Sequence, residues 1–153
     1  MPSLHAALTE PGLAGLYRVD GRVSVAAVRR VAAETGCACY LIDGAAIADK
    51  ASFLRACAEA LRFPPYVGRN WDALEEALRD LGWLGKAQAR GVVILLDPAA
   101  PFLRRAPRDW AVARSVLVSA ADHWRATATP LTILLRRADG LARDLPLLGN
   151  GEG

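Results

Sequence analysis

The chain has 153 residues, of which 53% are hydrophobic and 23% are charged, a composition typical of a globular protein and not of a disordered one. This length suits one domain and is too short for two ordinary ones. The longest apolar run, VVILL at 92–96, is far shorter than the roughly 18 residues that a membrane span needs. Because the N-terminus also lacks the features of a secretory signal, we expect a cytoplasmic protein with no membrane attachment.

The formal net charge is +3 at pH 7, and such an excess can indicate nucleic acid binding. Here it is carried by scattered arginine pairs at 29–30, 104–105 and 136–137. Neither interleaved aromatic residues nor a glycine-rich basic tail accompanies them. This pattern favours a solvated surface, and we expect no specific nucleic acid partner.

In chain order, the first 15 residues hold two prolines and two glycines, which predict a loosely ordered segment. The stretch 16–25 contains an Asp-Gly pair that could turn a hairpin. We favour the alternative of a short strand ending at Val19 and a helix over 24–35. The valine spacing in that helix and its end at Gly36 support this interpretation.

The next segments alternate between strand and helix patterns. Residues 37–42 (CACYLI) predict a buried strand, and 48–61 places apolar residues three and four apart, as an amphipathic helix does. Two prolines in the loop RFPPYVG end that helix. Asn70 is a good N-cap for the following helix, which we expect to end at Gly82. Its predicted inward stripe is Trp71, Leu74, Leu78 and Leu81.

The three cysteines, Cys37, Cys39 and Cys57, are an odd number for an unexported chain. The first two share a face if they lie on a strand. However, neither a second pair nor a suitably spaced histidine completes a zinc site. We expect largely buried free thiols, no metal site and no cofactor.

In the second half, residues 91–97 predict a buried strand, Pro107 opens a long helix that reaches Trp124, and 131–135 predicts a third strand. Strands without in-out alternation, separated by helices, indicate an α/β domain built on a small three-stranded parallel sheet packed with helices. We divide the chain into an N-terminal extension at 1–35, the α/β domain at 36–138 and a frayed tail at 139–153.

Patterns of catalytic residues are weak. Asp43 and Asp97 follow strands, where ligand sites of α/β proteins lie, but aspartate is also a routine turn residue there. His5 and His123 are the two histidines that could act as bases. Neither a Gly-x-Ser-x-Gly elbow nor a glycine-rich phosphate loop is present. We therefore expect no catalytic residues and no enzyme activity.

The stretch FPPYVGRNWDALEEAL at 63–78 places three carboxylates and no cation on the start of a helix in a basic chain. Asp72, Glu75 and Glu76 fall on adjacent rows of one helical face. An ordinary solvated face, with Arg79 as an intrahelical partner, would explain the carboxylates alone.

The loop before this helix has a different character, because Tyr66 and Val67 stand between prolines and a glycine, where little burial is expected. Carboxylates ringed by aromatic anchors describe a surface suited to a concave, cationic protein partner. This observation favours a binding function for the stretch.

The same stretch resembles the signature of the barstar family, the intracellular inhibitors of barnase-type ribonucleases. That signature has proline, aromatic residues, glycine, any residue, asparagine, a bulky residue and Asp-Ala-Leu opening a helix; here it stands as PPYVGRNWDALEEAL, followed by Trp83. The order of elements from about 36 to 136 is also that of the family, so the resemblance implies a barstar-like fold. Val67 replaces a frequent aromatic residue, and Arg69 replaces a common acidic one.

The resemblance implies that the loop and helix plug a nuclease active site, with carboxylates in place of RNA phosphates. The partner would be an extracellular-type or toxin ribonuclease, and this protein a monomeric inhibitor that confers toxin immunity. The alternative is a barstar-like interaction or regulatory module that binds a different protein or a small ligand. The residues expected to contact the partner are Tyr66, Val67, Gly68, Asn70, Trp71, Asp72, Glu75, Glu76 and Trp83.

Overall fold

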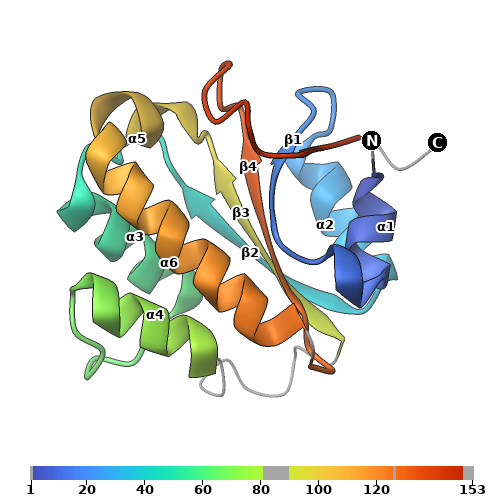
Figure 1. The fold of residues 1–153 in the computed structure, drawn as a ribbon, viewed down its shortest axis with the longest axis horizontal. Coiled ribbons are helices and arrows are strands. Elements are labelled where there is room, and N and C mark those ends of the chain that lie inside the picture. Colours follow the sequence, from blue (N-terminus) through green and yellow to red (C-terminus); the bar gives the residue numbers. More distant parts are fainter. Residues whose placement is uncertain (1, 81–89, 126, 150–153) are drawn as a thin grey trace.

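A computed structural model describes residues 2–80, 90–125 and 127–149, and it places helices on both faces of a parallel β-sheet (Figure 1). The strand order is β2-β3-β4-β1-β5, and all neighbouring strands are parallel. The predicted α/β class with a parallel sheet is therefore confirmed. The strands are β1 (Leu16–Val19), β2 (Cys37–Asp43), β3 (Gly91–Asp97), β4 (Leu131–Arg136) and β5 (Leu147–Leu148).

Among the described residues the sheet has five strands, so the predicted number of three is wrong. The short strand predicted to end at Val19 is present as β1, but it joins this sheet, as β5 also does. These two strands come from the segments that we assigned to the N-terminal extension and the tail. β1 pairs with the central strand β4 along its whole length, and β5 pairs with β1 through Arg18 and Leu147. The sheet of the domain thus includes residues from both ends of the chain.

The N-terminal segment also differs from the loose structure that we predicted. It forms helix α1 and a short 3-10 helix, because Ser3 caps α1 with a hydrogen bond from the Ala6 amide, 3.0 Å. Leu4 is fully buried. Its amide donates to the Gly149 carbonyl at 3.2 Å, which ties the start of the chain to the segment after β5.

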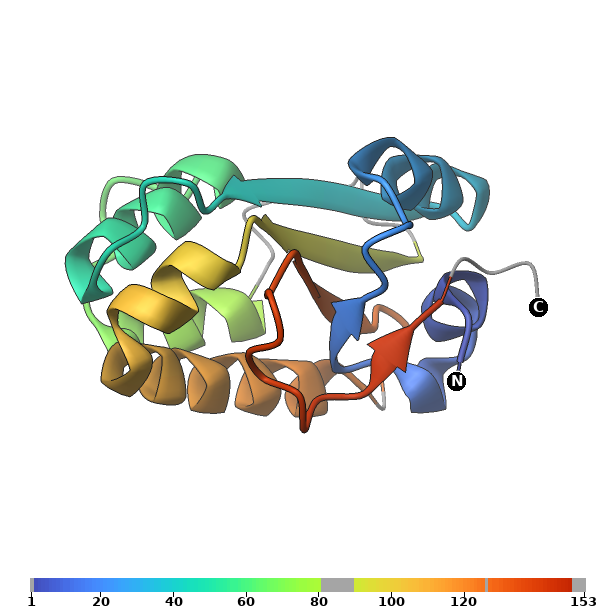
Figure 2. The same cartoon turned by 90° about the horizontal axis from the view of Figure 1, so that it is seen from above.

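Helices cover both faces of the sheet, as the two views show (Figures 1 and 2). α1 and α2 pack on one face, and α3 to α6 pack on the other. The helices predicted at 24–35, at 48–61, from Asn70 and from Pro107 are all present, whereas Leu81 and Gly82 lie outside the described residues. The helix bounds are α1 (Leu4–Thr9), η1 (Pro11–Leu13), α2 (Val25–Glu34), α3 (Lys50–Leu61), α4 (Trp71–Asp80), α5 (Ala100–Arg105) and α6 (Pro107–Arg125).

β3 shows why the strands lack alternation in sequence. All seven of its residues are buried. Val93 and Leu95 belong to the core under α1 and α2, while Ile94 and Leu96 belong to the core under α3 to α6. A strand covered on both faces needs apolar residues at every position.

β2 is less buried than its apolar sequence predicts, because it lies at an edge of the sheet (Figure 2). Cys37 and Cys39 are half-buried and point to the same face, whereas Cys57 on α3 is buried. The prediction of largely buried thiols is therefore correct for Cys57 and wrong for the other two. An edge strand has a sheet neighbour on one side, which leaves its side chains partly open to solvent.

Candidate functional site

The loop between α3 and α4 presents an aromatic side chain to solvent. α3 ends at Leu61, its C-cap residue Arg62 has a left-handed φ of 54°, and the chain then turns through the two prolines. Phe63 packs against the core and fixes the start of the loop. A turn closed by the Val67 amide on the Pro64 carbonyl, 3.0 Å, follows. Tyr66, at the tip of this turn, is 81% exposed.

α4 is held firmly from both ends and from beneath. The Asn70 side chain accepts a hydrogen bond from the Ala73 amide at 2.8 Å, as predicted for the N-cap. Leu74 and Leu78 are buried in the core. The Trp124 indole on α6 donates to the Leu78 carbonyl at 2.7 Å. The contacts beneath α4 therefore hold its outer face in a fixed position.

Trp71 supports the start of α4 and is half-buried against the core. Its ring lies 6.0 Å from that of Phe53, and the Lys50 ammonium lies 5.7 Å from its centroid. Such a cation over an indole ring is attractive. One part of the ring therefore holds the helix in place, and the remainder is open to solvent.

The three predicted carboxylates do not have the same surroundings. Glu75 is half-buried and lies 3.8 Å from the Arg79 guanidinium, which in turn donates to the Ser119 hydroxyl at 2.7 Å. Asp72 and Glu76 are exposed. Within the described residues neither makes an ion pair. Two of the three carboxylates thus face solvent, with no cation partner among the described residues.

Between the loop and α4 lies a hollow with a volume of about 180 Å³. Four predicted site residues, Tyr66, Val67, Gly68 and Glu76, line it together with Ala73, Ala77 and Asp80. The other predicted residues are not in this lining. Asn70 caps α4, while Trp71, Asp72 and Glu75 lie on the helix itself, and Trp83 lies outside the described residues. The hollow combines apolar walls with two carboxylates, which suits a cationic side chain that has an apolar stem.

Asp80 is the one acidic lining residue that our sequence analysis did not select. It follows Glu76 by four positions, and residues four apart share a helical face. The same spacing rule that grouped the other carboxylates would have included it. With Glu76, it doubles the negative charge at the wall of the hollow.

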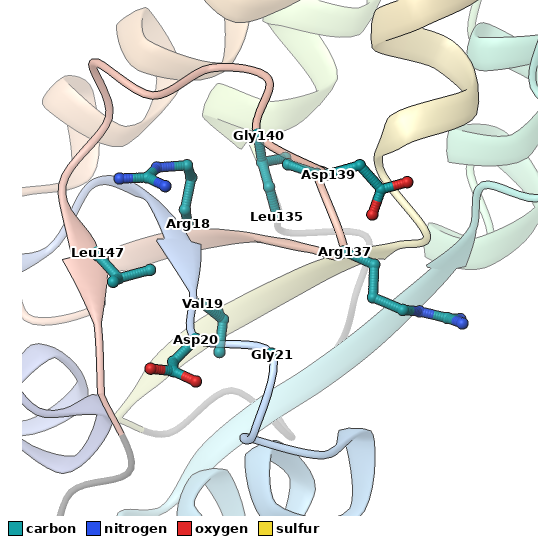
Figure 3. Close-up of a pocket in the computed structure, with 10 residues that line it drawn as sticks. Arg18, Val19, Asp20, Gly21, Leu135, Arg137, Asp139, Gly140 and Leu147 are labelled. Carbon is teal, nitrogen blue, oxygen red and sulfur yellow. The ribbon is translucent and has the colours of Figure 1, made fainter.

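A second hollow, of about 350 Å³, lies at the carboxyl ends of β1 and β4, where α/β proteins often bind ligands (Figure 3). Its two arginines point away from each other (Figure 3). The Arg18 guanidinium donates to the Leu145 carbonyl at 3.0 Å, and that of Arg137 donates to the Asp97 carboxylate at 2.8 Å. Both guanidinium groups therefore already donate hydrogen bonds to acceptors within the protein.

Asp97 and Asp43, the carboxylates at strand ends, also have internal partners. They face each other in the β2–β3 register. Asp97 is buried between Arg137 and Arg136, with the latter guanidinium at 3.3 Å. Asp43 accepts from the Ala45 amide at 3.0 Å. Their contacts are those of a salt bridge and a turn.

The other reactive groups are similarly unremarkable in their surroundings. His123 packs edge-on against Trp124, and His5 lies exposed on α1. Burial raises the pKa of the Cys57 thiol to about 12, which keeps it protonated at neutral pH. Residues 2–80, 90–125 and 127–149 contain no group of three or more His, Cys, Asp or Glu side chains placed to hold a metal ion. Over the same part of the chain, no helix has the length and apolar character needed to cross a bilayer.

Comparison with known proteins agrees with the geometry of loop and helix. Residues 37–136, from the start of β2 to the end of β4, match the family model described as Barstar (barnase inhibitor). No curated protein matches the chain. The matched region contains the exposed loop, α4 and the hollow between them, and it makes up most of the sequence. The chain belongs to the barstar family.

Proposed function

We propose that this protein inhibits a barnase-type ribonuclease by inserting α4 and the loop before it into the nuclease active site. The observation that carries the proposal is the pair of exposed carboxylates, Asp72 and Glu76, which lie near the exposed Tyr66 and form no ion pair with any residue that the structure describes. Membership of the barstar family supports it, because the family is that of the barnase inhibitor.

Electrostatics explains how such a surface blocks a nuclease. An active site that binds RNA phosphates gathers arginine and lysine donors, and carboxylates satisfy these donors through strong charge-assisted hydrogen bonds. Glu76 and Asp80 border the hollow, so that a cationic side chain entering it meets two negative groups. Opposite charges also speed the encounter of the two proteins.

Rigidity of the support adds to affinity, since a surface already ordered in the free protein loses little conformational entropy on binding. The Asn70 cap, the buried Leu78 and the Trp124 hydrogen bond provide this order for α4. We assign Trp71 and Glu75 to the periphery of the contact, because each is partly engaged by its own protein. Val67, Gly68 and Trp83 complete the proposed contact set.

The biological setting that we propose is the cytoplasm of a cell that makes, or meets, a toxic ribonuclease. A monomeric inhibitor there would confer immunity by capturing any nuclease present in that compartment. An extracellular-type or toxin ribonuclease is the partner that this setting requires.

The test is titration of barnase-type ribonucleases, beginning with any encoded beside this gene, with the wild type and with Glu76→Ala. We expect the substitution to weaken binding by about 2–5 kcal/mol, because the cation that Glu76 would meet is left buried and unpaired. Since Glu76 is exposed, the free energy of unfolding should change by no more than about 0.5 kcal/mol.

A matched control is Glu34→Ala, which removes the same charge from an exposed position at the end of α2. It should leave the affinity unchanged. If the two variants lost affinity equally, the acidic residues would act through long-range charge and not through direct contact with the nuclease. Unchanged affinity of Glu76→Ala, together with a large loss of stability, would contradict the proposal.

A second candidate function is favoured by Arg69, an exposed cation within the loop itself. A barstar-like module whose partner is a different protein would use this charge at a position that is commonly acidic in the family. Two results together would support that function. No barnase-type ribonuclease would bind the wild type, and the wild type would capture another protein from the native cell that Tyr66→Ala and Arg69→Glu fail to capture.

A further inference from the structure

The outer edge of β2 is a second surface with the features of a binding site. Within the described part of the chain, β3 is its one strand neighbour. The β2–β3 register runs without a bulge from Cys37 opposite Gly91 to Asp43 opposite Asp97. β2 contains neither proline nor a basic residue. Bulges, prolines and lysines are the usual means by which proteins protect an edge strand from pairing, so this edge is open to another strand.

A hollow of about 610 Å³ follows this edge. Its floor is Cys39, Tyr40 and Leu41, and its walls are Arg29 of α2 and the end of α3 at Ala60, Leu61 and Arg62. Cys39 and Leu41 pack toward the core under α2, while Tyr40 packs toward the core under α3. The hollow therefore wraps around the strand, with one exposed arginine beside each face of the sheet.

We propose that this edge binds an extended, acidic peptide segment of a partner protein, which adds to the sheet as a strand beside β2. Backbone hydrogen bonds to the edge supply affinity in this mode, and side-chain contacts supply specificity. Successive side chains of a strand point to opposite faces. Two consecutive acidic residues in the segment would thus reach Arg29 on one face and Arg62 on the other.

The positions of the two arginines favour this occupant over a second copy of the chain. A symmetric antiparallel pair of β2 strands centred on Tyr40 would place Arg29 near its own copy on one face. Arg62 would likewise meet its copy on the other face. Like charges across a strand pair are destabilising, and the net charge of +3 opposes self-association further.

This surface is separate from the one proposed for the nuclease. The lining of the β2 hollow and that of the α4 hollow have no residue in common. Glu76→Ala should therefore leave the edge unaffected, and the inference does not depend on which ribonuclease, if any, binds α4.

The test uses the whole protein and a capped peptide, Thr-Val-Glu-Glu-Val-Thr, titrated to millimolar concentration at low salt by NMR. We expect shift changes and slower amide exchange confined to β2 and to the adjoining ends of α2 and α3. A peptide with lysines in place of the glutamates, and one with proline at a central position, should not bind. Glu76→Ala should behave as the wild type.

The charge-reversed variant Arg29→Glu/Arg62→Glu carries the specificity test. It should lose at least about tenfold in affinity for the acidic peptide and bind the lysine peptide instead, while its circular dichroism spectrum remains that of the wild type. Three results would overturn the inference: no shift in β2 at millimolar peptide, equal binding of the lysine peptide, or concentration-dependent dimers that protect β2 without peptide.

Discussion

Two carboxylates of this protein, Asp97 at the end of β3 and Glu76 on α4, have opposite surroundings. Asp97 is buried and contacts the guanidinium groups of Arg136 and Arg137 at 3.3 and 2.8 Å. Glu76 is exposed, lines a hollow and has no ion pair within the described residues. One carboxylate has its cations inside the molecule, while the other faces solvent.

This difference separates a structural charge from one available to a partner. A buried carboxylate costs desolvation energy, which its internal cations offset, so its removal leaves those cations without a partner. An exposed carboxylate is hydrated at little cost, and it gains most when an external cation replaces that water in a dry interface. Stability and affinity are therefore expected to respond to different acidic residues.

The largest effect on stability is expected for Asp97→Ala. Loss of the carboxylate removes the ion-pair partner that Arg136 and Arg137 share, which should lower the free energy of unfolding by about 3 kcal/mol. This value is at the low end of the usual range, because the Arg137 side chain is 55% exposed. Urea unfolding measures it, and nuclease titration of the folded variant should give the wild-type affinity. A loss of affinity without a loss of stability would show instead that the Asp97 carboxylate serves binding and not the fold.

A smaller effect is expected at the Asn70 cap. Asn70→Ala removes the acceptor for the Ala73 amide and should cost about 1 kcal/mol. Ser24→Ala removes the equivalent cap of α2, where the hydroxyl accepts from the Ala27 amide at 3.0 Å, and it should cost a similar amount. The two variants have the same kind of defect in different places. Only Asn70→Ala should also weaken nuclease binding; equal affinities would show that the order of α4 does not matter for binding.

Asp72 is expected to contribute to both properties, since it lies in the first turn of α4 and is exposed. Asp72→Asn should lower the free energy of unfolding by about 0.3–1 kcal/mol, because a negative charge there is favourable to the helix dipole. Its effect on affinity should exceed its effect on stability and should shrink as salt is added. Stability loss without affinity loss would place Asp72 with Asp97 as a structural charge.

The sequence was most informative where a pattern is local and repeated. The run of five apolar residues at 92–96 identified β3, and Asn70 with the apolar stripe behind it identified α4. β5 could not be found in this way, since two residues show no period and its pairing with β1 joins positions that are distant in sequence. The burial of β2 was overestimated for a related reason. An apolar strand is central or at an edge according to the order of the strands, which local sequence does not contain.

The candidate site was likewise predicted where the signal is local in sequence and missed where it depends on tertiary contacts. The family signature located the loop and α4, and the structure gathers Tyr66, Val67, Gly68 and Glu76 around one hollow. Sequence alone did not separate Glu75 from Glu76, because the contact of Glu75 with Arg79 depends on side-chain positions.

The smallest effect is expected for the partly exposed ion pair of Arg114 and Asp144. Its carboxylate is more exposed than Asp97 but, unlike Glu76, has a cation partner among the described residues. The Arg114 guanidinium on α6 donates to the Asp144 carboxylate at 3.1 and 2.5 Å, and these hydrogen bonds hold the pKa of Asp144 below its usual range. A carboxyl with a lowered folded pKa stabilises the fold above its unfolded pKa of about 3.9 and loses that contribution as the pH falls through the folded value. Asp144→Asn should therefore be slightly less stable than the wild type at pH 7. The difference in urea midpoint should shrink as the pH falls below about 3.9 and vanish once the pH is below the folded pKa of Asp144. High salt should reduce the difference at neutral pH, because Asp144 is exposed and Arg114 is only half-buried. A difference that persisted at acid pH would assign the effect to packing of the side chain instead of its charge.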